Sequence, residues 1–318
     1  MLLRRRVLEE GSDLRDKVVV VNNGIGFHYY YYAKNQWIYV DTTAGIAKTL
    51  SLGWPITSFY YLFKDASSLK SVDLSGYNTS PVKDMREMFG NCTELETVIW
   101  GDVDTSAVTD MSRMYINCAN LVNADMSKQI TSNVTSMRSM FSNCASLPEL
   151  DLSNFDTSNV TDMYSMFRNL ETCVKLNVSS FDTSKATNMS LMFADLYMLP
   201  ELDVSSFDSS NVTDFRYMFH KCRALTELLL SNFVMGNGTN FEYMFYSCEN
   251  LEFLDISGFE APNFNSEGSI NNMFTNCNKL KKIRCPSSFK AWALENQDVI
   301  KLPVAMREGG TGTWELVN

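Results

Sequence analysis

Residues that could carry acid–base or nucleophilic chemistry are few in this sequence. Of its two histidines, His28 and His220, the second lies two residues before Cys222. A histidine beside a thiol is the pair that activates a cysteine nucleophile. Cys222, however, is one of a set of cysteines that recurs at a fixed spacing, which is typical of a buried core position. We therefore predict no catalytic residues and no enzymatic activity.

Six of the eight cysteines share one repeated position, with spacings of 26 residues or a multiple of 26 and a last step of 29: Cys92, Cys118, Cys144, Cys222, Cys248 and Cys277. Leu170 and Leu196 fill the same position between them. A position that accepts either cysteine or leucine is apolar, so we predict buried free thiols, with disulfides between adjacent copies as the alternative. The sequence has no Cys-x-x-Cys pair, and we predict neither a metal site nor a cofactor.

Carboxylates form a second periodic set that could meet cations or a basic partner. The residues of this acidic stripe share two neighbouring positions that we expect to point outward from strands: Asp73, Asp125, Asp151, Asp203 and Asp255, and Glu149, Glu201 and Glu227. Like charges side by side on adjacent strands repel one another. The stripe is therefore either a solvated face, which is the simpler interpretation, or the candidate partner-binding surface.

A repeat sets the elements that must position these side chains. The same aromatic slot recurs at a spacing of 26 residues seven times and then of 29, at Phe63, Phe89, Tyr115, Phe141, Phe167, Phe193, Phe219, Phe245 and Phe274. Nine copies in phase predict a stack of supersecondary units rather than a domain with one central core.

Within one unit, two hydrophobic periods follow each other. Leu150 and Leu152 alternate with acidic residues, which predicts a half-buried strand. Met163, Met166 and Phe167 have helical spacing, and Thr161 or Asp162 is a suitable N-cap. We therefore predict a parallel sheet on one face of the stack and one to two helical turns per unit on the other.

Both ends of the chain lie outside the repeat, which we place at residues 46–285. Residues 17–21 and 27–32 are predicted to be strands joined by an Asn-Gly turn, with a third strand at 37–40. Residues 1–45 are interpreted as an N-terminal arm and cap; the alternative is a docking patch formed by Arg4, Arg5, Arg6, Tyr29 and Tyr31. Residues 286–318 are predicted to be a C-terminal cap with a helix at 289–294 and a strand at 313–317.

The composition excludes several classes of partner. The formal net charge is −10, so a nucleic-acid partner, which needs a basic face, is not expected. No apolar run approaches the ~18 residues of a membrane span. The acidic stretch after the first arginines has no apolar segment, so we expect no export signal there.

The run from Leu150 to Phe167, Leu-Asp-Leu-Ser-x-Phe-Asp-Thr-Ser-Asn-Val-Thr-Asp-Met-x-x-Met-Phe, resembles the BspA-like leucine-rich repeat family. The resemblance covers about three quarters of the chain. It implies an α/β solenoid of nine leucine-rich repeats, used for adhesion or protein recognition without catalysis. Departures are local, and the clearest is Gln129 in place of the corner aromatic. The C-terminal tail is also similar to the ends of phage-encoded proteins with these repeats.

The sequence therefore predicts a non-enzymatic protein that presents a rigid repeat surface to a protein or glycan. Because no export signal is expected, a virion-associated decoration or tail protein at the virion surface is the first hypothesis. A bacterial or protist cell-surface adhesin is the second, and an intracellular interaction scaffold is the third.

Overall fold

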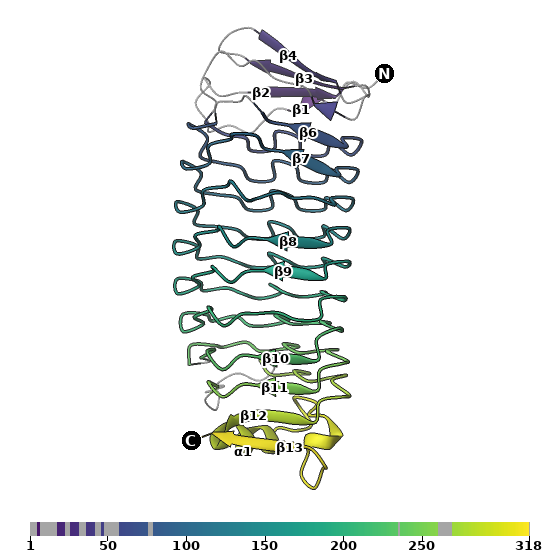
Figure 1. The fold of residues 1–318 in the computed structure, drawn as a ribbon, viewed down its shortest axis with the longest axis vertical. Helices are drawn as coiled ribbons and strands as arrows, with labels where there is room; N and C mark the ends of the chain where they lie inside the picture. Colours follow the sequence, from purple (N-terminus) through teal and green to yellow (C-terminus); the bar gives the residue numbers. More distant parts are fainter. Residues whose placement is uncertain are drawn as a thin grey trace.

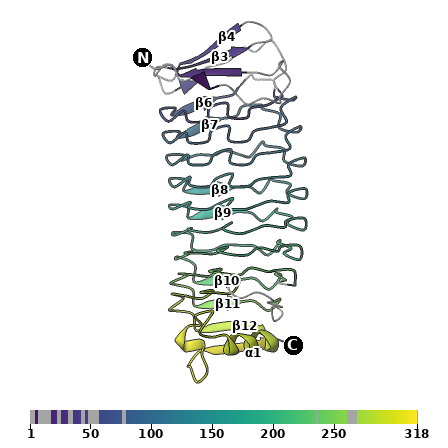
Figure 2. The same cartoon turned by 180° about the vertical axis from the view of Figure 1, so that it is seen from behind.

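The chain winds into a long rod of stacked turns (Figure 1). In this computed structural model, residues 57–75, 79–234, 236–259 and 269–317 are described with their side chains, and the backbone of five short strands is described before them. The turns follow one another in sequence order along the rod in both views (Figures 1 and 2). Each turn therefore packs on the turns before and after it, as the repeat predicts.

One side of the rod is built from short parallel strands. They are β5 (Ile46–Ala47), β6 (Ser71–Asp73), β7 (Thr97–Ile99), β8 (Glu149–Asp151), β9 (Lys175–Asn177), β10 (Glu227–Leu229), β11 (Phe253–Asp255), β12 (Lys282–Pro286) and β13 (Thr313–Val317). In β8 and β9, Leu150 pairs with Leu176 and both side chains are buried. The predicted parallel strands with inward leucines are confirmed, and they form three separate sheets, β5–β7, β8–β9 and β10–β13.

A second column of parallel bridges joins the turns on the other side of the rod. It runs through Ser58, Asp84, Asp110, Ser136, Asp162, Asn188, Asp214 and Asn240. The architecture is a parallel-strand β-solenoid of about eight turns with little helix, and the predicted count of nine units is not confirmed.

The helical turns predicted beside this column are not confirmed either. Residues 164–169 form consecutive hydrogen-bonded turns in which Ser165 and Asn169 have φ values of 58° and 61°. A residue with positive φ interrupts a right-handed helix. The N–H groups of Ser165 and Phe167 donate instead to the carbonyls of Ser190 and Met192 in the next turn, at 2.9 and 3.0 Å. The N–H groups of Met166 and Arg168 bond within the turn, to the carbonyls of Met163 and Ser165 at 3.2 and 3.3 Å. The helical spacing of the methionines thus arises from a backbone whose successive N–H groups bond alternately to the next turn and to their own.

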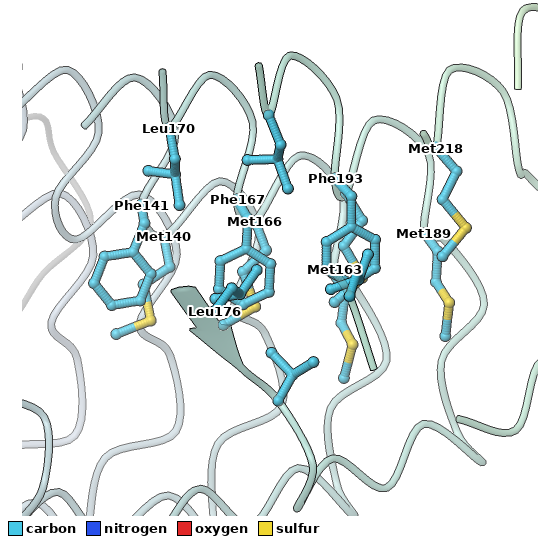
Figure 3. Packing of buried hydrophobic residues seen from close by; sticks show 14 of the residues in the cluster. Met140, Phe141, Met163, Met166, Phe167, Leu170, Leu176, Met189, Phe193 and Met218 are labelled. Atoms are coloured by element: carbon cyan, nitrogen blue, oxygen red, sulfur yellow. The ribbon is translucent and has the colours of Figure 1, made fainter. Parts of the chain in front are cut away.

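The space between the two sides is filled by columns of identical side chains (Figure 3). Phe141, Phe167 and Phe193 are fully buried, and their ring centroids stack at 6.3 and 5.7 Å. Met140 and Met163 lie beside them in Figure 3. Each such side chain stabilises the fold by roughly 1.5–3 kcal/mol when fully buried. Because a ring is covered by the rings above and below it, the core exists only between stacked turns.

Buried hydroxyl groups connect the corners of successive turns. Thr157 Oγ1 donates to the carbonyl of Asp182 at 2.8 Å, and the N–H of Asp156 donates to Thr131 Oγ1 at 2.9 Å. The same position is buried throughout the column Thr79, Thr105, Thr131, Thr157, Thr183 and Ser209. These bonds satisfy backbone groups that would be costly to bury alone.

All eight cysteines are buried free thiols. Cys118 Sγ donates to the carbonyl of Phe89 at 3.1 Å, and Cys144 Sγ donates to that of Tyr115 at 3.2 Å. Burial raises the pKa of Cys92 to about 12. The predicted thiol column is therefore part of the core.

Different elements lie at the two ends of the rod. The N-terminal end carries an antiparallel sheet of β1 (Arg5–Arg6), β2 (Val18–Asn22), β3 (Gly26–Tyr31) and β4 (Gln36–Asp41), which confirms the three predicted strands. The C-terminal end carries α1 (Ser287–Glu295) and the 3-10 turn η2 (Val304–Met306), together with β13. Phe289 and Ala293 of α1 are buried, so this end of the core is covered.

Candidate functional site

The aspartates of the acidic stripe bind their own backbone. Asp151 Oδ1 accepts the N–H of Ser153 at 3.0 Å, and Asp203 Oδ1 accepts that of Ser205 at 2.9 Å. Asp73, Asp125 and Asp255 make the same bond to the serine two residues on. Aspartate in this arrangement stabilises a turn by replacing a backbone acceptor. The repeated aspartate therefore has a structural role at the corner that follows each strand.

The same bonds lower the pKa values of Asp151 and Asp203. Hydrogen bonds from the side chain and the N–H of Ser205 hold the pKa of Asp203 below its usual range. The backbone N–H and then the side chain of Ser153 do so for Asp151, where Asn177 adds a further bond. These two carboxylates are thus negatively charged at neutral pH.

The stripe is less continuous than the sequence suggests. Glu149, Glu201 and Glu227 are exposed, but Lys175 pairs in register with Glu149 and interrupts their column. Asp255 is only 5% exposed, and its Oδ2 lies 3.5 Å from Nη1 of Arg284. The exposed negative charge is therefore concentrated on the middle turns rather than along the whole rod.

An exposed apolar row borders this charge and was not predicted from the sequence. Its four residues occupy one position on consecutive turns: Val122, Pro148, Val174 and Pro200. Val122 and Val174 are 48% and 47% exposed, and Met198 beside the last member is 53% exposed. The N–H of Val174 donates to the carbonyl of Pro148 at 2.8 Å, which places these two residues on adjacent turns. Comparing the outward positions of the repeat, rather than the inward ones, would have revealed the row.

A cluster around Asp195 lies in the same turn as Pro200, five residues before it in the sequence. Asp195 Oδ1 lies 3.2 Å from Nδ1 of His220, 3.8 Å from Nζ of Lys221 and 3.3 Å from the hydroxyl of Tyr197. Its Oδ2 lies 3.4 Å from Nε of Arg168. Asp195 is only 6% exposed, so three basic side chains converge on one nearly buried carboxylate. We call these five residues the Asp195 cluster.

Burial alone would raise the pKa of Asp195. The hydrogen bond and charge of His220, with the charges of Lys221 and Arg168, outweigh it and hold that pKa below its usual range. Tyrosines surround the cluster: His220 stacks on Tyr246 with ring centroids 5.2 Å apart, and Tyr217 meets His220 edge-on at 5.3 Å. The surface here combines cations with aromatic edges.

The geometry does not assemble a nucleophile beside His220. Cys222 is buried, and its Sγ donates to the carbonyl of Phe193 at 3.1 Å, so the thiol points into the core. His220 is instead half-buried against Asp195. In the part of the chain that the structure describes, no group of three or more His, Cys, Asp or Glu side chains is placed to hold a metal ion.

Comparison with known families identifies the repeat. The family described as "Mycoplasma protein of unknown function, DUF285" matches residues 55–103, 98–199 and 169–287, which together span most of the solenoid. The chain belongs to this family. The DUF285 match and the repeat solenoid fit the predicted BspA-like repeat, whereas neither shows a phage origin.

No curated protein matches the DUF285 chain. A solved structure, "Crystal structure of TLR13-ssRNA13 complex", is similar to it with 14% sequence identity and a TM-score of 0.33. The similarity covers 73% of this chain and 30% of that chain. At this identity and TM-score, the similarity carries no argument about what the DUF285 chain binds.

The predicted docking patch of the DUF285 chain falls on residues whose side chains lie outside the described part. Arg5 and Arg6 form β1, and Tyr29 and Tyr31 lie in β3, where Tyr29 pairs with Val20 of β2. Arg4 lies outside the described residues altogether. The patch therefore stays a prediction. Among the described residues, no helix is long and apolar enough to cross a membrane.

Proposed function

We propose that this DUF285 protein is a non-enzymatic binding protein that recognises a protein partner through the sheet-side corner of its solenoid. The observation that carries the proposal is the apolar row of Val122, Pro148, Val174 and Pro200, exposed on four consecutive turns beside ionised carboxylates. Adjoining apolar side chains exposed at one position are characteristic of an interaction site, whereas isolated ones are ordinary.

The hydrogen bonds of the other repeated polar residues support the apolar row as the binding site. Asp151 and its equivalents bond their own corners, and Thr157 and its equivalents bond the next turn. The thiols of the cysteine column donate to core carbonyls. These repeated aspartates, hydroxyls and thiols thus hold the solenoid together, whereas the exposed glutamates and the variable outward positions are left for recognition.

A pair of matched variants tests the proposal. Val174→Asp introduces a negative charge into the apolar row. Ile130→Asp is the control: it introduces the same charge at another corner of the solenoid, where the apolar side chain of Ile130 is 48% exposed, about as much as that of Val174. We expect immobilised wild-type protein to retain a saturable ligand from surface-protein extracts of its source culture. Val174→Asp should reduce that retention at least tenfold, whereas Ile130→Asp should not. Equal retention by the two variants would contradict the proposal.

The place where the protein acts is a separate proposal. Virion association, predicted from the sequence, has no support from the fold or from the family match, and a cell surface is the alternative. Antibody against the purified protein, applied to intact cells and to particles purified from the same culture, distinguishes the two. Labelling of particles alone would support a virion location, and protease-sensitive labelling of cells would support a surface adhesin.

A further inference from the structure

The apolar row has a length and a spacing that select one kind of partner. Adjacent turns of a parallel sheet are about 4.8 Å apart, so the four row residues span roughly 14 Å. One turn of an α-helix rises about 5.4 Å, so three helical turns span roughly 16 Å. In an extended strand, residues on one face are about 6.6 Å apart. This spacing exceeds that of the row residues, so by the second pair the strand residues would no longer lie opposite them. The row therefore matches the apolar face of a helix lying along the rod.

Charge beside the row defines the other face of that helix. Glu149 and Glu201 directly follow Pro148 and Pro200, and Asp151 and Asp203 lie two residues further on in the same turns. All four are exposed carboxylates, and the serine bonds keep the two aspartates ionised at neutral pH. Lys175 is the one basic side chain among the corresponding positions of the intervening turn. A partner must accordingly bring positive charge to the sheet side of the row.

The opposite border of the row is almost uncharged. Ala145 and Ser146 are half-buried there, Thr172 is exposed, and Met198 adds an exposed thioether side chain next to Pro200. The exceptions are Glu171 and the guanidinium of Arg223, which lies over the ring of Tyr197 5.1 Å from its centroid. A helix seated on the row would therefore have one flank over small or apolar groups and the other over carboxylates, which is an arrangement suited to an amphipathic helix with basic residues on one side.

We propose that the apolar row and its neighbouring carboxylates bind a basic amphipathic helix of a partner protein, about three turns long and aligned with the rod axis. The proposal rests on the binding function proposed above and names the class of ligand. Apolar side chains at i, i+4, i+7 and i+11 of that helix contact Val122, Pro148, Val174 and Pro200. Lysines or arginines on its sheet-side flank meet Glu149, Asp151, Glu201 and Asp203.

A fluorescently labelled synthetic peptide provides the probe. It is an 18-residue helix with leucines at those four spacings and lysines along one flank. Two control peptides have the same composition in scrambled order and the same pattern with glutamate in place of lysine. Fluorescence anisotropy should show saturable binding of the basic helix to the full chain, with at least tenfold weaker binding of both controls. Equal binding of the scrambled peptide would overturn the proposal.

Substitutions in the protein locate the site. Val174→Asp should weaken binding of the basic helix at least tenfold, and Glu149→Lys with Glu201→Lys should both weaken it and favour the glutamate peptide. Ile130→Asp and Glu308→Lys, an exposed carboxylate near the C-terminus, are the matched controls and should leave it unchanged. Circular dichroism and the denaturation midpoint show that each variant remains folded.

The outcome also separates this proposal from the one on which it rests. If the helix fails to bind while Val174→Asp still abolishes retention of the culture ligand, the row binds a partner of another shape and only the present inference is overturned. If Val174→Asp affects neither ligand, both proposals are overturned.

Discussion

The carboxylate of Asp195 lies 3.2 Å from Nδ1 of His220, which belongs to the following turn. Asp195 stands at a position that carries asparagine in earlier turns. In those turns the asparagines bond one another: Asn117 Nδ2 donates to Asn91 Oδ1, and Asn143 Nδ2 donates to Asn117 Oδ1, each at 2.7 Å. The ion cluster therefore replaces a neutral amide ladder at the same corner. This exchange places a titratable carboxylate where Asn117 and Asn143 have neutral amides.

Replacing Asp195 by asparagine should lower stability at pH 7 by about 1–2 kcal/mol, because His220, Lys221 and Arg168 lose a charged partner. The pKa of Asp195 is lower in the folded protein than its ordinary value, so its stabilising contribution is present above about pH 4 and is lost as the pH falls through the folded pKa. Urea unfolding at a series of pH values should show a flatter acid limb for Asp195→Asn than for wild type. The control is Asp298→Asn, which removes an exposed partner of Arg307 and should cost under ~0.5 kcal/mol.

Gln129 should be replaceable with a gain in stability. It is 3% exposed, and neither polar atom of its side-chain amide has a hydrogen-bond partner within the described part of the chain. Other turns carry Phe155 and Phe181 at the same corner, where the rings stack at 6.5 Å. An unsatisfied buried polar group costs about 1–3 kcal/mol, so Gln129→Phe should raise the free energy of unfolding by that amount. Gln129→Leu is a second variant with a smaller side chain, which should stabilise the protein even if the phenylalanine is too large for the site. Destabilisation by both substitutions would show that the amide is satisfied.

Leu191 offers a direct test of the turn conformation. Its φ is 60°, a value that costs roughly 1 kcal/mol or more for a residue with a side chain. Leu191→Gly should therefore raise the denaturation midpoint if the left-handed backbone is correct. The gain is reduced by a small loss of packing, because the leucine side chain is half-buried. In the helix predicted from the methionine spacing, the same change would cost about 1 kcal/mol. The sign of the measured change in stability thus distinguishes the left-handed turn from the predicted helix.

The thiols of the cysteine column should not react measurably with thiol reagents in the native protein. Burial raises the pKa of Cys92 to about 12 and also raises those of Cys118 and Cys222. The reactive species is the thiolate, and here it is both rare and inaccessible. At pH 8 an aromatic disulfide reagent should titrate all eight thiols in denaturant and react at least a hundredfold more slowly without it. Rapid reaction of any column thiol in the folded chain would contradict the proposed packing.

Much of this architecture could be predicted from residue spacing. The 26-residue period places Phe141 on Phe167, and the alternation around Leu150 gives the parallel strand, because each residue repeats the environment of its counterpart one turn away. The candidate site was less predictable. The aspartates of the stripe are periodic because Asp151 bonds Ser153 within one corner, a role that a charge pattern alone does not distinguish from ligand binding.

The sequence by itself determined the order of the turns, the inward residues and the buried thiols, since burial of an apolar face on its next copy follows directly from the period. Only the tertiary structure decided the backbone of the methionine side, where Ser165 and its equivalents adopt positive φ because their N–H groups bond the next turn instead of their own. It also decided the surfaces: Val122, Pro148, Val174 and Pro200 become one row, and Asp195 meets His220, only when separate turns are laid side by side.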